Sequence, residues 1–194
     1  MNFRKHLELA WNLTLQFIVP LMLMTLIMVL VSGITMGIIA PVVLAGYMQS
    51  VLMMIRERRE PVIQDLFSYM NLFFPLLGFG IALFILITIG VVLLVLPGII
   101  IGIGVSFVCL YMLPLMTDKK LDLVESVKES FAMVTRPPIQ EHIVVLLLFM
   151  GISAIGSSVF IGWLFTQPIA TIFLMSAYDE LIHQSPPDDS LVQK

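Results

Sequence analysis

The sequence predicts an all-α integral membrane protein with six transmembrane helices, and three observations support this fold class. Hydrophobic residues make up 59% of the chain and charged residues 12%, with a mean hydropathy of +1.05. A soluble domain is about half apolar and a quarter charged. Three long runs of the chain lack Asp, Glu, Lys and Arg, and the longest extends from Leu66 to Thr117. Glycine or proline interrupts each run near its middle, which predicts a pair of helices in each.

The longest uncharged run contains the clearest pair. Residues 76–96 form one apolar segment and residues 98–116 a second, with Pro97 and Gly98 between them. Each segment is long enough to cross a hydrocarbon layer about 30 Å thick, which takes about 20 helical residues. Pro97 suits the start of the second helix, because the N–H that proline lacks has no helical partner there.

The other two runs predict less regular pairs. The first run predicts spans at residues 18–31 and 38–55, separated by Gly33 and Gly37. The third run, residues 142–178, breaks near residues 156–162. This run is short for two full spans and a turn, so we expect its helices to be short or partly re-entrant.

An amphipathic interfacial helix is expected before each pair. In the first of them, Leu7, Ala10 and Trp11 share one helical face, while Arg4 and Glu8 lie opposite. A tryptophan at the boundary of such a helix is typical of the membrane interface. The three amphipathic segments lie at residues 2–17, 62–74 and 122–134. The predicted architecture is therefore three hairpins, each preceded by an interfacial helix, with an internal repeat as a hypothesis.

Charge predicts the topology. Every Lys, Arg, Asp and Glu lies in the N-terminal segment, the two long loops or the C-terminal end of the chain. Six spans place all of these segments on one side, which the positive-inside rule makes cytoplasmic. We therefore expect a multi-pass protein of a bacterial inner (cytoplasmic) membrane with both termini cytoplasmic. Residues 1–183 form one membrane domain in this interpretation, and residues 184–194 a disordered tail.

The residues inside the spans argue against several classes of protein. Intramembrane ionisable residues mark proton and ion paths, and these spans have none, which disfavours an ion-coupled pump. The spans also lack paired carboxylates, a Cys–His pair and a Ser–His–Asp set, so no catalytic residue and no cofactor is predicted. His142 and His183 have acidic neighbours near the predicted surface but no tight ligand motif, so no metal site is predicted. A nucleic-acid partner is not expected either, because the chain has no basic stripe.

Two sets of residues are candidate sites for interactions. Arg56, Arg58 and Arg59 could contact anionic lipid head groups at about 1 kcal/mol per charge, or could serve only to fix the topology. Gly98, Gly102 and Ser106 are spaced four residues apart. Such a stripe of small residues favours close helix packing, with a substrate groove as the less favoured alternative.

An ordered series of short motifs resembles a known family. The series consists of Pro41 with Ala45-Gly46-Tyr47, Arg58 with Glu60 and Asp65-Leu66-Phe67, Pro97-Gly98, Pro114 with Asp118, and Glu125 with Ser130. It resembles a widespread bacterial family of uncharacterised six-span membrane proteins. That family is distantly similar to the membrane domain of glycerophosphodiester phosphodiesterases. The resemblance implies a membrane-domain fold and a lipid context, and it carries over no catalytic residues.

Together these observations predict a protein that is not an enzyme. The expected function is to organise lipid or a membrane partner through the interfacial helices of the cytoplasmic face, with membrane lipids and a membrane protein or a second copy as partners. A transporter or channel for a neutral or lipidic substrate is the alternative, because internal repeats are common in transporters.

Overall fold

The computed structural model describes residues 2–93, 95–157 and 160–184. Within those residues the chain is helical, with short connections and no strands. Residues 185–194 lie outside this description, and so does most of the predicted disordered tail. Nine α-helices and two 3₁₀ helices are described: α1 (Phe3–Gln16), α2 (Ile18–Ile34), α3 (Ala40–Glu57), η1 (Ile63–Phe67), η2 (Met70–Leu72), α4 (Phe73–Leu93), α5 (Val95–Val108), α6 (Met112–Asp118), α7 (Leu123–Thr135), α8 (Ile139–Ser157) and α9 (Phe160–Gln184).

Three segments are long and apolar enough to cross a membrane: Ile63–Val91, Gly98–Asp118 and Ile139–Gly156. A fourth is obtained if α1 and α2, which meet at an angle of 91°, count as one bent span. The structure therefore establishes an all-helical chain with three or four candidate spans. The six-span arrangement in three hairpins stays a prediction.

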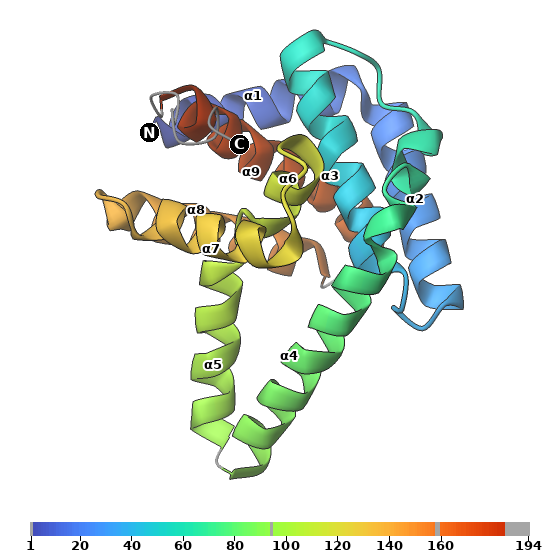
Figure 1. Ribbon diagram of the computed structural model, residues 1–194. Coiled ribbons are helices and arrows are strands. Elements are labelled where there is room, and N and C mark those ends of the chain that lie inside the picture. Colours follow the sequence, from blue (N-terminus) through green and yellow to red (C-terminus); the bar gives the residue numbers. More distant parts are fainter. Residues whose placement is uncertain (1, 94, 158–159, 185–194) are drawn as a thin grey trace, which may run out of the picture.

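The body of the molecule is built around α3 and α9, which contact each other. Tyr47 and Leu52 of α3 and Phe173 and Tyr178 of α9 have no more than 1% of their surface exposed. Helices α1 and α8 pack on α9, while α6 packs on α3 (Figure 1). The most thoroughly buried helices are thus not the most hydrophobic ones.

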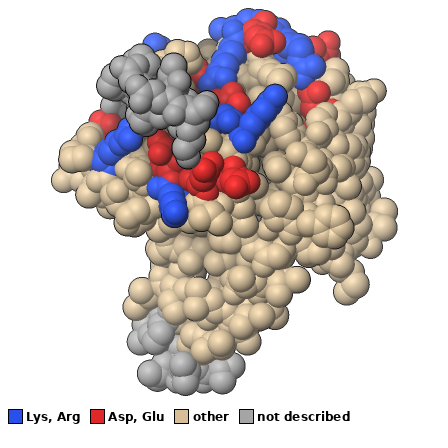
Figure 2. All heavy atoms as spheres, in the orientation of Figure 1, with Lys and Arg blue, Asp and Glu red and all other residues tan. Residues whose placement is uncertain are grey.

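Helices α4 and α5 form an extension from this body. Figure 1 shows them running away from the other helices and approaching each other at their far end. Phe84, Ile85 and Ile100 are more than half exposed. Figure 2 shows the charged side chains gathered at the opposite end of the molecule, and the lobe formed by α4 and α5 free of them among the described residues. This separation agrees with the charge pattern of the sequence.

The prediction of an amphipathic α-helix at residues 62–74 is wrong, because most of this segment forms 3₁₀ helices. The segment forms η1 and η2 before α4 begins at Phe73. It is pressed against α3 at Gly46, where an added Cβ would lie 2.4 Å from the carbonyl oxygen of Asp65. Asp65 also accepts hydrogen bonds from Ser50 of α3 and from Arg59. The apolar periodicity of this segment predicts a regular α-helix. The segment forms two short 3₁₀ helices in its place, and they are held against α3 by these contacts.

The candidate span Gly98–Asp118 agrees with the span predicted at residues 98–116, but its helix is interrupted. Helix α5 ends at Val108 and α6 begins at Met112. Pro114 provides no N–H for a helical bond to the carbonyl of Leu110, four residues earlier. At the break itself, the N–H of Tyr111 donates to Ser130 Oγ at 3.1 Å. The Ser130 hydroxyl in turn donates to the carbonyl oxygen of Val108 at 2.6 Å. Ser130 of α7 thus satisfies both sides of the break.

Candidate functional site

A polar network joins three helices at the charged end of the body. Arg56, at the end of α3, donates from Nη1 to Asp118 Oδ1 at 2.6 Å and from Nη2 to Asp118 Oδ2 at 3.1 Å. Its Nε donates to Asp179 Oδ1 of α9 at 2.6 Å. The hydroxyl of Tyr178 donates to Asp118 Oδ2 at 3.2 Å. We call these four residues the Arg56 network, and they tie α3, α6 and α9 together.

The Arg56 network is partly shielded from solvent. The exposed fraction of the side chain is 29% for Arg56, 14% for Asp118 and 21% for Asp179. Burial alone would lower the pKa of Arg56, but its hydrogen bonds to Asp118 and Asp179 outweigh that effect and raise the pKa. Bidentate pairing of a guanidinium with a carboxylate is both strong and geometrically specific. The charged guanidinium of Arg56 therefore cross-links α3, α6 and α9 through two carboxylates.

Arg59 is also paired within the chain. Its Nη2 donates to Asp65 Oδ2, an atom that also accepts from Ser50 Oγ at 2.6 Å. Arg58 differs from both neighbours. It caps the end of α3 in the left-handed conformation (φ 57°), and its side chain is exposed without an ion pair among the residues described. Of the three arginines predicted to contact lipid head groups, two are thus held by carboxylates of the protein and one points outward.

A second polar contact lies deeper in the body. The hydroxyl of Tyr111 is 3.3 Å from Nδ1 of His142, which places the predicted surface histidine of α8 in a buried pair. The ring centroids of Tyr111 and Tyr178 are 6.2 Å apart. His183 lies elsewhere, with Nδ1 2.8 Å from the carbonyl oxygen of Asp179. Over the described ranges, no three His, Cys, Asp or Glu side chains converge on a common metal position.

The sequence analysis missed the role of His6. This residue of α1 is 4% exposed, and its Nδ1 lies 2.7 Å from Ser176 Oγ of α9. Its Nε2 lies 2.6 Å from Glu180 Oε2. The buried face of α1 consists of His6, Ala10, Leu13 and Thr14. His6 lies on the same helical face as Ala10, Leu13 and Thr14, and this spacing could have predicted that it is buried. Its charged neighbours Arg4, Lys5 and Glu8 favoured an exposed position in the sequence analysis.

Because α1 is turned so that His6 faces α9, part of its predicted apolar face points outward. Trp11 is 57% exposed and Leu15 is 51% exposed. Beside Trp11 lies a groove of about 540 Å³ between α1, α8 and α9. Six residues line this outer groove: Leu7, Glu8, Trp11, Asn12, Ile152 and Ile169.

The predicted stripe of small residues on α5 has two different environments. An added Cβ at Gly98 would lie 2.8 Å from the backbone nitrogen of Val91, so this residue allows the close approach of α4. An added Cβ at Gly102 would meet nothing within 4 Å. Ser106 donates to the carbonyl of Gly102 in its own helix at 2.8 Å. Packing at Gly102 and Ser106 thus stays a prediction that requires a partner outside the chain.

Comparisons with family models, with curated proteins and with solved structures found no match to this chain. The suggested resemblance to the uncharacterised six-span family consequently stays a prediction.

Proposed function

We propose that this chain is a multi-pass integral membrane protein without catalytic activity that organises lipid or a membrane partner at its charged face. The observation that carries the proposal is the separation of two surfaces. One end of the body holds the charged side chains, and the α4–α5 extension is apolar and exposed (Figure 2). An exposed apolar surface of this extent is stable only in lipid or against another protein.

The topology belongs to the same proposal. With six spans, the charged end faces the cytoplasm of a bacterium and both termini lie there. Helices α2, α3 and α9 then supply the spans beyond the three candidates found by length and hydropathy. α2 and α9 are apolar along most of their length, and Pro168 lies within α9.

Lipid head groups are the favoured ligands of the charged face. Arg58 is its best-placed arginine, because Arg56 and Arg59 already have carboxylate partners within the chain. A basic side chain near an anionic membrane surface contributes about 1 kcal/mol, roughly fivefold in affinity. This estimate makes Arg58→Gln the informative single change.

The test measures lipid retained by purified protein from bilayers that contain phosphatidylglycerol. Arg58→Gln should reduce the retained anionic lipid, while the neighbouring change Glu57→Gln should leave it equal or raise it. Equal retention by the wild type and the Arg58→Gln variant would contradict the assigned role of Arg58.

The alternative function is transport of a neutral or lipidic substrate. The same purified protein in liposomes tests the ion-coupled form of this alternative, since an organiser moves neither protons nor Na⁺ under a pH gradient or a membrane potential. Reproducible flux above that of empty liposomes would overturn the organiser proposal in favour of a transporter.

A further inference from the structure

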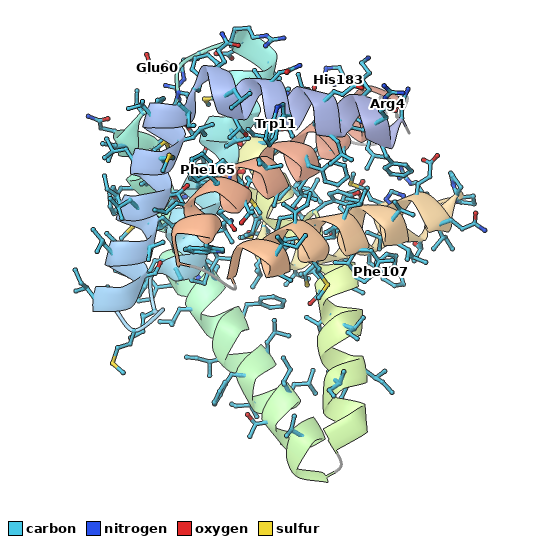
Figure 3. All side chains as sticks on the ribbon, turned by 180° about the vertical axis from the view of Figure 1, so that it is seen from behind. Arg4, Trp11, Glu60, Phe107, Phe165 and His183 are labelled. Carbon is cyan, nitrogen blue, oxygen red and sulfur yellow. The ribbon has the colours of Figure 1, made fainter. Side chains whose placement is uncertain are left out.

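The outer groove has the features of a lipid site distinct from the cluster of Arg56, Arg58 and Arg59. Its walls are chiefly apolar: Leu7 and Trp11 come from α1, Ile152 from α8 and Ile169 from α9. Its volume of about 540 Å³ falls within the range of about 300–1,000 Å³ that is usual for small-molecule sites. Figure 3 shows Trp11 where α1 passes over α9. The groove thus lies where three separate helices meet.

The exposure of α1 indicates what surrounds the groove. Trp11 and Leu15 are more than half exposed, although the opposite side of α1 is fully packed on α9. Tryptophan is enriched where the membrane meets water, because its ring is apolar and its N–H is polar. If the chain is embedded in a membrane as proposed above, Trp11 places the outer groove at the level of the lipid head groups.

The rim of the groove adds charge complementarity. Glu8 Oε1 accepts from Arg4 Nε at 2.8 Å, and both side chains are more than half exposed. Asn12 follows Glu8 by one helical turn and also lines the groove. One edge therefore presents a carboxylate and a carboxamide with a guanidinium beside them. A head group that carries both an ammonium and a phosphate matches this order of charges.

We infer that the outer groove binds one acyl chain of an aminophospholipid, such as phosphatidylethanolamine, with Glu8 and Asn12 accepting from its ammonium and Arg4 pairing with its phosphate. Leu7, Trp11, Ile152 and Ile169 contact the chain. An anionic phospholipid lacks the ammonium and sets its negative charge beside the Glu8 carboxylate. Unfavourable contact of this kind gives selectivity as effectively as an attractive contact does. The inference rests on the proposed membrane location but not on the role of Arg58.

Quenching of Trp11 fluorescence by brominated acyl chains tests this site. The chain has two tryptophans, so Trp163→Phe leaves Trp11 as the only reporter. This variant is placed in phosphatidylcholine nanodiscs that contain brominated phosphatidylethanolamine or brominated phosphatidylglycerol at the same low mole fraction. We expect stronger quenching by the ethanolamine lipid, and loss of that difference in Glu8→Gln. The control Glu60→Gln, which removes a carboxylate outside the groove, should keep the difference.

Three outcomes would overturn the inference: equal quenching by the two lipids, a difference that persists in Glu8→Gln, or no quenching by either lipid. Circular dichroism of each variant shows that it is folded before quenching is compared. Arg58→Gln serves as the separating variant, because it should lower anionic lipid retention without changing the quenching of Trp11. The two measurements therefore test the lipid role of Arg58 and lipid binding in the outer groove separately, and either proposal can be contradicted without the other.

Discussion

The α3–α9 pair and the α4–α5 extension are both helical and apolar, yet they are stabilised differently. Phe173 and Tyr178 of α9 are fully buried, whereas Phe84 of α4 is 72% exposed. Polar side chains link helices in the body, as Thr25 does by donating to Tyr47 at 3.1 Å. In the extension, Thr88 and Ser106 bond, among the residues that the structure describes, only to carbonyls of their own helices. The comparison shows that hydropathy identifies the helices whose apolar side chains are exposed, while interhelical polar contacts identify the helices that hold the body together.

The largest effect should come from a matched pair of glycine substitutions. Gly46→Ala places a Cβ against the backbone of Asp65 and Leu66, where no flexible side chain can yield. Overpacking typically costs about 1–3 kcal/mol, and we expect the upper end here. Gly102→Ala meets open space and should be neutral or stabilising by up to about 1 kcal/mol from helix propensity.

Unfolding of both glycine variants in detergent micelles, followed by circular dichroism, measures this difference. Equal free energies of unfolding for the two variants would remove the contrast between body and extension. Destabilisation by Gly102→Ala would instead reveal a close partner at α5, as the small-residue stripe predicts.

The next effect concerns the Arg56 network. Arg56→Gln leaves Asp118 and Asp179 without their shared cation, and the loss of one partner of a fully buried pair costs about 3–5 kcal/mol. Because 29% of the Arg56 side chain is exposed, we expect a smaller loss of about 2 kcal/mol in the free energy of unfolding. Arg58→Gln, two residues further along the chain, should change that free energy by less than about 0.5 kcal/mol. Chemical denaturation measures the free energy of unfolding of both variants. A lower value for Arg58→Gln than for Arg56→Gln would contradict this account.

A smaller effect tests the joint between the extension and the body. Ser130→Ala removes the acceptor of the Tyr111 N–H and the donor to the carbonyl of Val108. Leaving such buried groups unpaired costs about 1–3 kcal/mol, and we expect about 1 kcal/mol because α5 and α6 can adjust at their break. The control Ser106→Ala removes a hydrogen bond within one exposed helix and should be nearly silent. Thermal unfolding that is unchanged by Ser130→Ala would show that the joint does not depend on this hydroxyl.

Much of this arrangement could be read from the sequence, and the exceptions have physical reasons. The uncharged run around Pro97 and the segregation of charge predict the extension and the charged end, because both are properties of composition along the chain. The pairing of Arg56 with Asp118 and Asp179 could not be predicted, because the two carboxylates lie far from Arg56 in the sequence. The separation is 62 positions for Asp118 and 123 positions for Asp179. The break near Tyr111 likewise depends on Ser130, which arrives from another helix.

The candidate sites follow the same division. Sequence patterning placed Trp11 at a membrane interface, but the groove beside it exists only because Ile152 and Ile169 arrive from α8 and α9. The cluster of Arg56, Arg58 and Arg59 could be recognised in the sequence, whereas the carboxylates that pair with Arg56 and Arg59 could not be predicted. Local patterns thus indicate which surface a residue belongs to, and tertiary contacts decide whether it is available for a ligand.

The central claim is that the α4–α5 extension lies in lipid while the charged end lies outside it. Spin labels on single cysteines, introduced at Ile85, Ile103 and Glu60 in a Cys109→Ser background, test this claim in reconstituted bilayers. Molecular oxygen concentrates in the hydrocarbon and a polar nickel chelate stays in water, so collision rates with the two report the location of each label. We predict high oxygen and low nickel accessibility at Ile85 and Ile103, and the reverse at Glu60. High nickel accessibility at Ile85 and Ile103 would place the extension in water and contradict the account.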